Sequence, residues 1–240
     1  MSESVFKRRI KIFTDSSDKA QMLETSKNPL ISGFTTNPTL MRKAGVSDYQ
    51  AFCKDILSLI RDKPISFEVF ADDLSTMERQ AKEITTWGQN VYVKIPVTNS
   101  LGESTAKLVN RLSHSGVKLN VTAILTPRQV LEVCNALQGG APSIVSVFAG
   151  RIADTGRDPI PYMAACKEIC AAHGKEIELL WASSRELLNI IQAERTGCEI
   201  ITVTTDIIKK MTMLDRDLDA LSLDTVKMFK SDAESAGYKL

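Results

Sequence analysis

The chain has 240 residues, a size that suits one (β/α)8 barrel or two smaller domains. A net charge of +1 gives no field that would favour nucleic acid or an anionic membrane as a partner. The apolar runs are strand-sized, far shorter than the ~20 residues that span a bilayer. Residues 1–4 lack the pattern of a signal peptide, so we expect a cytoplasmic protein.

Eight short runs rich in β-branched and aromatic residues recur along the chain and predict buried strands. They cover 10–14, 30–35, 65–70, 91–97, 118–125, 143–148, 177–181 and 200–203. Segments of helical periodicity fill the gaps, at 18–25, 38–61, 74–88, 101–115, 127–137, 159–173, 184–196 and 205–213.

This alternation predicts an α/β fold, a (β/α)8 TIM barrel that forms one domain over 1–240. The rival architecture is an open doubly wound sheet, which favours a glycine-rich loop after its first strand, but 12–17 contains no glycine. The tail at 214–240 predicts an additional helix, with apolar residues on one face at Leu218, Leu221, Val226 and Phe229. Such a helix would cap the barrel or pack on a neighbouring subunit.

The five cysteines are scattered, and no histidine or carboxylate cluster accompanies them at metal-ligand spacing. We interpret them as reduced core residues and expect no metal site.

Lys94 lies in the middle of the fourth predicted strand. Burial of an unpaired ammonium group is costly, so a lysine in a buried strand tends to lose its proton. A neutral amine in a shielded pocket attacks carbonyl carbon, as Schiff-base chemistry requires. The alternative is a lysine near a strand end whose side chain extends to water. The segment alone leaves both interpretations open.

Polar residues occur at the ends of the first seven predicted strands, which in a barrel meet at one mouth. They are Asp15, Thr36, Asn37, Glu68, Lys94, Asn120, Thr122, Ser146, Arg151, Ser183 and Arg185. Taken singly, several of them could be helix caps. Together they suit a phosphorylated carbonyl substrate, because an amine can attack the carbonyl, carboxylates can move protons and guanidinium groups can hold the phosphate.

Three segments resemble signatures of the transaldolase family: TTNPT at 35–39, VYVKIPVT at 91–98 and FAGRI at 148–152. The resemblance extends from about Ile10 to the C-terminus. It implies a class I (β/α)8 barrel that forms a Schiff base and needs no metal or organic cofactor.

The resemblance also implies catalytic roles. Lys94 would form an imine with the C2 carbonyl of a ketose phosphate. Asp15 would take the proton of the C4 hydroxyl as the C3–C4 bond breaks. Glu68 and Thr122 would hold a water that moves protons during loss of the carbinolamine hydroxyl.

The substrate-binding residues implied by the resemblance are Asn37, Asn120, Ser146, Phe148, Arg151, Ser183 and Arg185. Asn37 and Ser183 would bind the dihydroxyacetone portion, and the two arginines would bind the phosphate. The chain departs from the larger family members at Ser184, where they typically carry an aromatic residue, so Arg185 could sit differently. Arg157 is a second candidate anion ligand, with a solvated loop arginine as the alternative.

Length and the C-terminal tail are similar to the short subfamily that includes fructose 6-phosphate aldolases, which assemble into large rings. Those aldolases carry Gln at the position of Glu68 and Tyr at that of Phe148, whereas the residues here resemble true transaldolases. A carboxylate titrates and an amide does not, and a phenylalanine cannot orient a protonating water. We therefore expect a transaldolase of the pentose phosphate pathway that acts on sugar phosphates.

Two alternatives to this function are an aldolase that releases free dihydroxyacetone and a non-catalytic barrel that binds sugar phosphates. We expect a homo-oligomer, a pentamer or decamer rather than a dimer.

Overall fold

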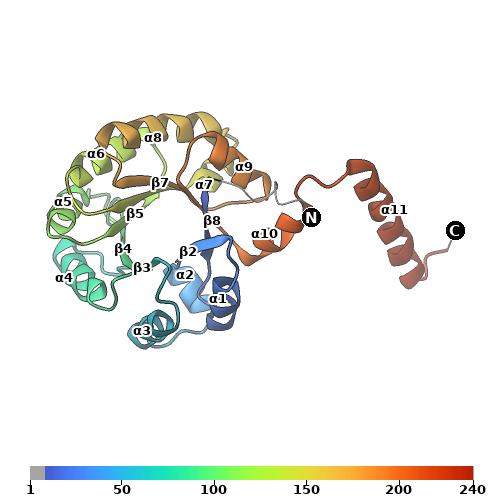
Figure 1. Ribbon diagram of the computed structural model, residues 1–240, viewed down its shortest axis with the longest axis horizontal. Helices are drawn as coiled ribbons and strands as arrows, with labels where there is room; N and C mark the ends of the chain where they lie inside the picture. The colour runs from blue at the N-terminus through green and yellow to red at the C-terminus, as the bar shows by residue number, and fades with distance from the viewer. Residues whose placement is uncertain (1–8, 240) are drawn as a thin grey trace. The chain divides into compact units, whose positions relative to one another are not determined.

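Eight parallel strands close into a barrel in chain order in the computed structural model, which describes residues 9–239 (Figure 1). They are β1 (Lys11–Asp15), β2 (Ile31–Thr35), β3 (Ile65–Glu68), β4 (Val91–Pro96), β5 (Leu119–Ile124), β6 (Ser143–Val147), β7 (Ile177–Trp181) and β8 (Ile200–Val203). Each strand overlaps one predicted run, and the predicted barrel is confirmed. Residues 1–4, from which we expect no signal peptide, and Leu240 of the predicted tail lie outside the described residues.

The interior of the barrel is filled by side chains that project from alternate strand positions. Phe13, Ile144, Leu180, Ala182 and Ile200 form one buried cluster. Three of these positions lie two residues before a polar side chain of the barrel mouth, on β1, β6 and β8. The apolar core therefore forms a floor beneath the polar strand ends.

Helices follow the strands and surround the barrel (Figure 1). They are α1 (Lys19–Ser26), α2 (Pro38–Lys43), α3 (Tyr49–Leu59), α4 (Leu74–Thr85), α5 (Ala106–His114), α6 (Pro127–Leu137), α7 (Ala149–Ala153), α8 (Pro159–His173) and α9 (Leu188–Arg195). Local sequence explains several helix starts. Thr126 and Gln129 form a reciprocal capping box at α6, with Pro127 in the first turn.

The prediction of one helix over 38–61 is wrong, because the segment forms α2 and α3. Gly45, with φ of +70°, turns the chain after α2, and the Asp48 side chain caps α3 by accepting from the N–H of Ala51. The predicted helices at 101–115 and 184–196 begin later, at Ala106 and Leu188. The short helix α7 was not predicted.

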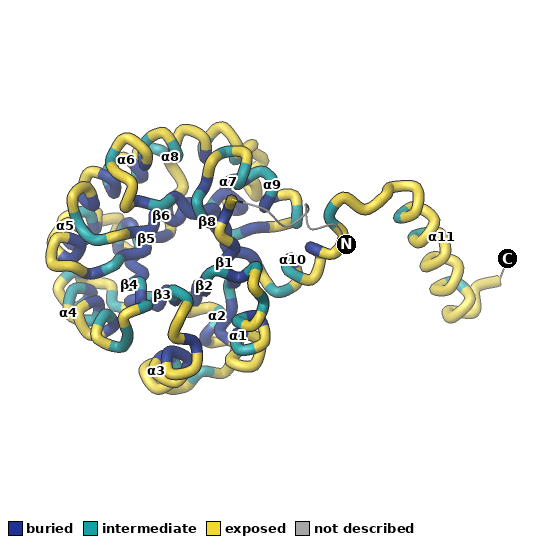
Figure 2. The backbone as a smooth tube through the Cα atoms, in the orientation of Figure 1, coloured by how far each residue is buried: buried dark blue, intermediate teal, exposed yellow. Residues whose placement is uncertain are grey.

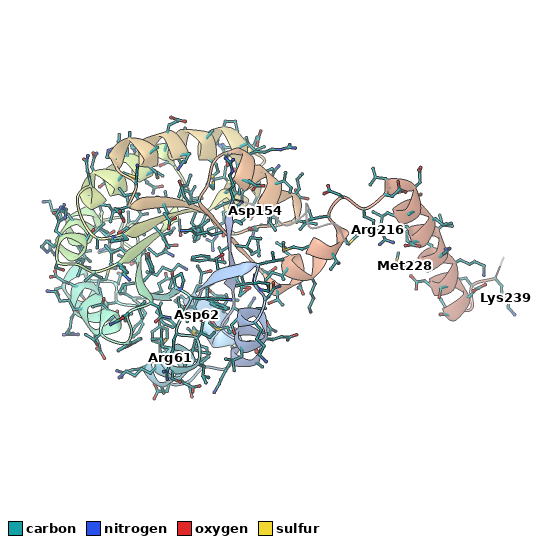
Figure 3. All side chains as sticks on the ribbon, in the orientation of Figure 1. Arg61, Asp62, Asp154, Arg216, Met228 and Lys239 are labelled. Carbon is teal, nitrogen blue, oxygen red and sulfur yellow. The ribbon has the colours of Figure 1, made fainter. Side chains whose placement is uncertain are left out.

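The chain from Lys209 onward forms a second unit. It begins within the last turn of α10 (Thr205–Lys210) and contains the 3-10 turn η2 (Met211–Met213) and α11 (Leu218–Ser235), so the predicted C-terminal helix is confirmed. No residue of α11 is buried (Figure 2), and apolar side chains such as Phe229 and Met228 are exposed (the latter is labelled in Figure 3). That 1–240 is a single domain stays a prediction. Within the described part of the chain, no helix has the length and apolar character of a membrane span.

Candidate active site

A cavity of about 480 Å³ opens at the carboxyl ends of the barrel strands. Ten of the eleven predicted catalytic and substrate-binding residues line it: Asp15, Asn37, Glu68, Lys94, Thr122, Ser146, Phe148, Arg151, Ser183 and Arg185. Parallel strands bring these residues together because their carboxyl ends share one face of the barrel. The strands β1 and β3 to β7, or the segments just after them, supply most of the polar groups.

Lys94 projects from β4 into this cavity and is only 7% exposed. Its Nζ donates a hydrogen bond of 2.9 Å to the carbonyl oxygen of Thr36 and lies 3.3 Å from Oε2 of Glu68. The strand register places Lys94 and Glu68 side by side on β4 and β3. The amine is therefore inside the barrel, and the alternative of a lysine that extends to water does not apply.

Asp15 ends β1 on the cavity wall. Burial raises the pKa of the Asp15 carboxyl, and this effect outweighs the charge of Lys94 and the hydrogen bonds from Thr35 and Asn37, which act to lower the pKa. Thr35 Oγ1 donates to Oδ1 at 3.0 Å, and Nδ2 of Asn37 lies 3.4 Å from Oδ2. A carboxyl group with a raised pKa is a stronger base once it is ionised.

Asn37 combines the two roles that its sequence position allowed. Its Oδ1 caps α2 by accepting from the N–H of Leu40 at 2.9 Å, while its Nδ2 faces Asp15. The cap fixes the amide orientation, so the N–H donors point toward the cavity. Asp15 itself caps no helix, because Asp18 caps α1.

Asn120 is the predicted site residue that does not line the cavity. It is fully buried, its Nδ2 donates to Ser66 Oγ at 3.0 Å, and its Oδ1 accepts from Ser146 Oγ at 2.6 Å. It faces inward one layer deeper than Thr122, two residues later on β5. Our expectation that Asn120 lines the pocket is therefore corrected: it supports Ser146 from below.

The backbone is strained at two places on the cavity wall. Ala123 has φ of 61° and Ser183 has φ of 62°, both in the left-handed region that non-glycine residues seldom adopt. The pairing of β5 with β6 is irregular between Val121 and Ile124, as in a β-bulge, which changes the direction of the side chains there. Strain of this kind concentrates at functional sites.

The two predicted phosphate-binding arginines differ in their contacts. Arg185 is paired with Asp154 (labelled in Figure 3) through Nε at 3.0 Å and Nη2 at 2.5 Å, and its Nη1 donates to the carbonyl oxygen of Ser183 at 2.9 Å. This pairing raises the pKa of Arg185 and lowers that of Asp154. Three of the five guanidinium N–H groups are thus used, which leaves two for an anion. The Arg151 guanidinium stacks on the Phe148 ring at 4.9 Å.

Arg157 does not line the cavity. It is exposed, and its Nη1 donates to Thr155 Oγ1 at 2.8 Å. The interpretation as a solvated loop arginine fits this position better than that of an anion ligand.

Several cavity residues were not predicted as site residues, among them Thr202 and Thr204, and also Thr35 and Ser184, which were noted only in connection with the family resemblance. Threonine is itself a strong strand former, so a threonine within an apolar run is counted toward the strand rather than toward the site. The alternation of side chains along β8 could have predicted the position of Thr202. Thr202 lies two residues after the core residue Ile200, so both side chains point to the same side of the strand.

Residues 12–240 match the family model described as Transaldolase/Fructose-6-phosphate aldolase. The chain belongs to this family. Its relatives include a probable transaldolase of Dehalococcoides mccartyi, 35% identical over 202 residues that cover 84% of this chain and 90% of the relative. A probable transaldolase of Thermoanaerobacter sp. is 33% identical over 231 residues, which cover 96% of this chain and the whole relative. Members of the transaldolase/fructose-6-phosphate aldolase family are enzymes of the aldolase kind, and so is this chain.

Solved structures with low sequence identity share the architecture of this family member. The chain superposes on QR15, an aldolase, with a TM-score of 0.54 and 13% identity, covering 90% of this chain and all of that one. The 3-hexulose-6-phosphate synthase from Salmonella typhimurium gives a TM-score of 0.56 and 14% identity, covering 84% and 90%. At such identities the likeness concerns the barrel fold alone.

Proposed function

We propose that this member of the family is a transaldolase. It moves a dihydroxyacetone unit from a ketose phosphate, such as fructose 6-phosphate or sedoheptulose 7-phosphate, to an aldose phosphate, an exchange of the pentose phosphate pathway. The observation that carries the proposal is Lys94, an amine enclosed in a cavity that it shares with two carboxylates and two arginines. The relatives named probable transaldolase agree with this function.

Imine formation starts when Lys94 loses a proton. Glu68, whose Oε2 lies 3.3 Å from Nζ, is the base in the cavity that can accept that proton when the substrate binds. Nζ then adds to the C2 carbonyl. The hydroxyl of Thr122 is buried and has no hydrogen-bond partner among the described residues, so it is free to help Glu68 hold the water that carries protons. The C2 hydroxyl leaves as water, and an iminium joins Nζ to C2.

Carbon–carbon cleavage uses Asp15 as the base. Its carboxylate takes the proton of the C4 hydroxyl, the C4–O electrons form an aldehyde, and the C3–C4 electron pair moves into the iminium to give an enamine. The aldose phosphate departs while the enamine stays on Lys94. Attack of the enamine on an acceptor aldehyde, with Asp15 returning its proton to the new hydroxyl, reverses the step before hydrolysis frees the product.

Phosphate binding falls to Arg151 and Arg185, which reach the cavity from segments after β6 and β7. A guanidinium group held by other contacts loses less conformational freedom when it binds an anion. The stacking of Arg151 on Phe148 and the pairing of Arg185 with Asp154 both provide such contacts.

Transfer requires that the enamine survive until an acceptor arrives. Phe148 lines the cavity without a hydroxyl that could orient a protonating water, and Glu68 retains a carboxylate where an amide could not titrate. Both features favour transfer over the alternative function, an aldolase that releases free dihydroxyacetone. The Glu68→Gln, Phe148→Tyr double variant is expected to raise acceptor-free cleavage relative to transfer, and no rise would count against the preference for transfer.

Borohydride reduction with fructose 6-phosphate tests the central step. Peptide mass mapping should find the reduced adduct on Lys94, and the Lys94→Met variant should carry none. Lys54, an exposed lysine of α3, is the internal control and should stay unmodified. A non-catalytic sugar-phosphate-binding barrel would bind the ligand and form no adduct, which would overturn the proposal.

The proposal includes a homo-oligomer, a pentamer or decamer rather than a dimer. Its support is α11, an 18-residue helix with no buried residue and with Leu218, Val226 and Phe229 at least 60% exposed. Helices of globular proteins owe most of their stability to a packed apolar face. Light scattering should report a mass of several chains, and a monomer at micromolar concentration would contradict this part of the proposal.

A further inference from the structure

Two threonines connect β8 to the carboxyl group of Asp15. Thr202 Oγ1 lies 2.6 Å from Thr35 Oγ1, and Thr35 Oγ1 donates to Asp15 Oδ1 at 3.0 Å. Both threonines are buried, with 6% and 3% exposure. The three strands concerned, β8, β1 and β2, are neighbours in the barrel, so the chain of hydrogen bonds is built into strand pairing.

The direction of these hydrogen bonds follows from counting protons. A threonine hydroxyl carries one proton and can donate only once. If Thr35 donates to Asp15, the proton of the 2.6 Å contact must come from Thr202. The chain therefore runs from Thr202 to Thr35 to an ionised Asp15, and every donor in it has an acceptor.

The opposite direction is less favourable. A protonated Asp15 that donated to Thr35 would make Thr35 donate to Thr202. Thr202 Oγ1 has no other hydrogen-bond partner within residues 9–239, so its proton would lose its protein acceptor. Charge-assisted bonds to a carboxylate are also stronger than bonds between neutral groups. The two hydroxyls thus favour the carboxylate form.

The other groups around Asp15 make this contribution matter. Lys94 from β4 is the cation that acts on it, and Glu68, Arg151 and Arg185 line the same cavity. Burial disfavours the charged carboxylate, and Asn37 supplies only a long contact of 3.4 Å. The short buried chain through Thr35 is the better-formed hydrogen-bonded support.

We propose that Thr202 is a positioning residue that, through Thr35, holds Asp15 oriented and ionised for carbon–carbon cleavage. The inference rests on the proposed function for the role of Asp15. Thr202 touches no reacting atom in this scheme. Its hydroxyl acts by fixing the only proton of Thr35 on the Asp15 side.

The test compares Thr202→Val with Thr202→Ser and with the matched control Thr14→Val. Thr14 is also a buried strand threonine beside Asp15, but its hydroxyl has no hydrogen-bond partner in the described structure, so the same substitution removes no bond. The loss of one hydrogen bond should raise the pKa of Asp15 by about half a unit. The acid limb of the kcat/KM profile for fructose 6-phosphate should move up equally, which is about a threefold loss below that limb. Thr202→Ser and Thr14→Val should match the wild type.

A direct titration separates this inference from the proposed function. Carbon-13 NMR of aspartate carboxyl groups, with Asp15→Asn for assignment, follows Asp15 whether or not the enzyme turns over. An unchanged Asp15 titration in Thr202→Val would overturn the role of Thr202, while a Lys94 adduct with fructose 6-phosphate would still uphold the proposed function. Absence of that adduct in the wild type would reject the function instead. If Thr202→Val does not fold, Thr202→Ala removes the same hydroxyl without adding bulk and is measured in the same way.

Discussion

A side-chain carbon on Gly150 would lie 1.6 Å from the carbonyl oxygen of Ser183. Only glycine therefore lets α7 approach the end of β7 as closely as it does. We expect Gly150→Ala to push apart the two segments that carry the arginines, with a loss of about 3 kcal/mol in unfolding free energy. Urea denaturation measures the loss. In the control Gly88→Ala the nearest atom is a side-chain oxygen of Asn90 at 3.1 Å, which would need to give by only a few tenths of an ångström, so equal losses in both variants would contradict this explanation.

Asp15→Asn should lower activity and raise stability. Loss of a catalytic base costs about 10²- to 10⁴-fold in turnover. Because burial raises the pKa of Asp15 above 3.8, its ionised form weakens the folded state, and that cost appears as pH rises through the folded-state pKa. The melting temperature of Asp15→Asn should thus exceed that of the wild type at pH 7. The difference should vanish below about pH 3.8, and a variant less stable at pH 7 would refute the sign.

Lys94→Met should reduce cleavage and transfer by at least about 10³-fold, because the covalent route is lost. The variant should also be less stable, since Glu68 loses its cation in a site where its side chain is only 18% exposed. Adding Glu68→Gln to Lys94→Met should recover part of that stability in thermal unfolding. Lys54→Met, at an exposed position of α3, is the control and should stay within about 0.5 kcal/mol of the wild type.

Asp154→Asn should raise KM for phosphorylated ketoses several-fold while leaving kcat nearly unchanged. Asp154 holds two N–H groups of Arg185, and without its charge the guanidinium is no longer fixed with its remaining donors available. Steady-state kinetics with fructose 6-phosphate and with unphosphorylated fructose separate the effect, because only the former should change. A lower KM would mean that Asp154 competes with the phosphate.

The same kinetics test Arg157→Ala, for which we expect less than about a twofold change, as for an exposed residue without a role. A rise in KM as large as that of Asp154→Asn would indicate that Arg157 binds the phosphate.

The barrel was predictable because strand and helix differ in period, and eight alternations leave few architectures. The break between α2 and α3 was not predicted, because we interpreted the amphipathic pattern as continuing across Gly45. The positive φ of Gly45 in the structure reveals the turn. The start of α5 was predicted five residues too early, at 101 instead of Ala106, because a contact outside the helix could not be foreseen. Thr98 and Ser104 form an isolated bridge that holds the segment before Ala106 out of the helix.

Most of the site was predictable because polar residues at parallel strand ends must converge. Asn120 was predicted less well, because the sequence alone does not show which of two inward-facing residues on β5, Asn120 or Thr122, reaches the cavity. The partner of Arg185 shows another. Asp154 is 31 residues away, and their contact depends on the packing of α7 against the end of β7.

The groups at the barrel mouth have different proposed roles in the first and second parts of the chain. Groups that would move protons or form the covalent bond come from the first five strands, whereas both arginines follow β6 and β7. A mutational library confined to 151–157 and 185–186 would therefore vary how the phosphate end of the sugar is held and leave the carbonyl chemistry intact. Directed evolution of new acceptor ranges has a natural boundary in this chain, between Thr122 and Arg151.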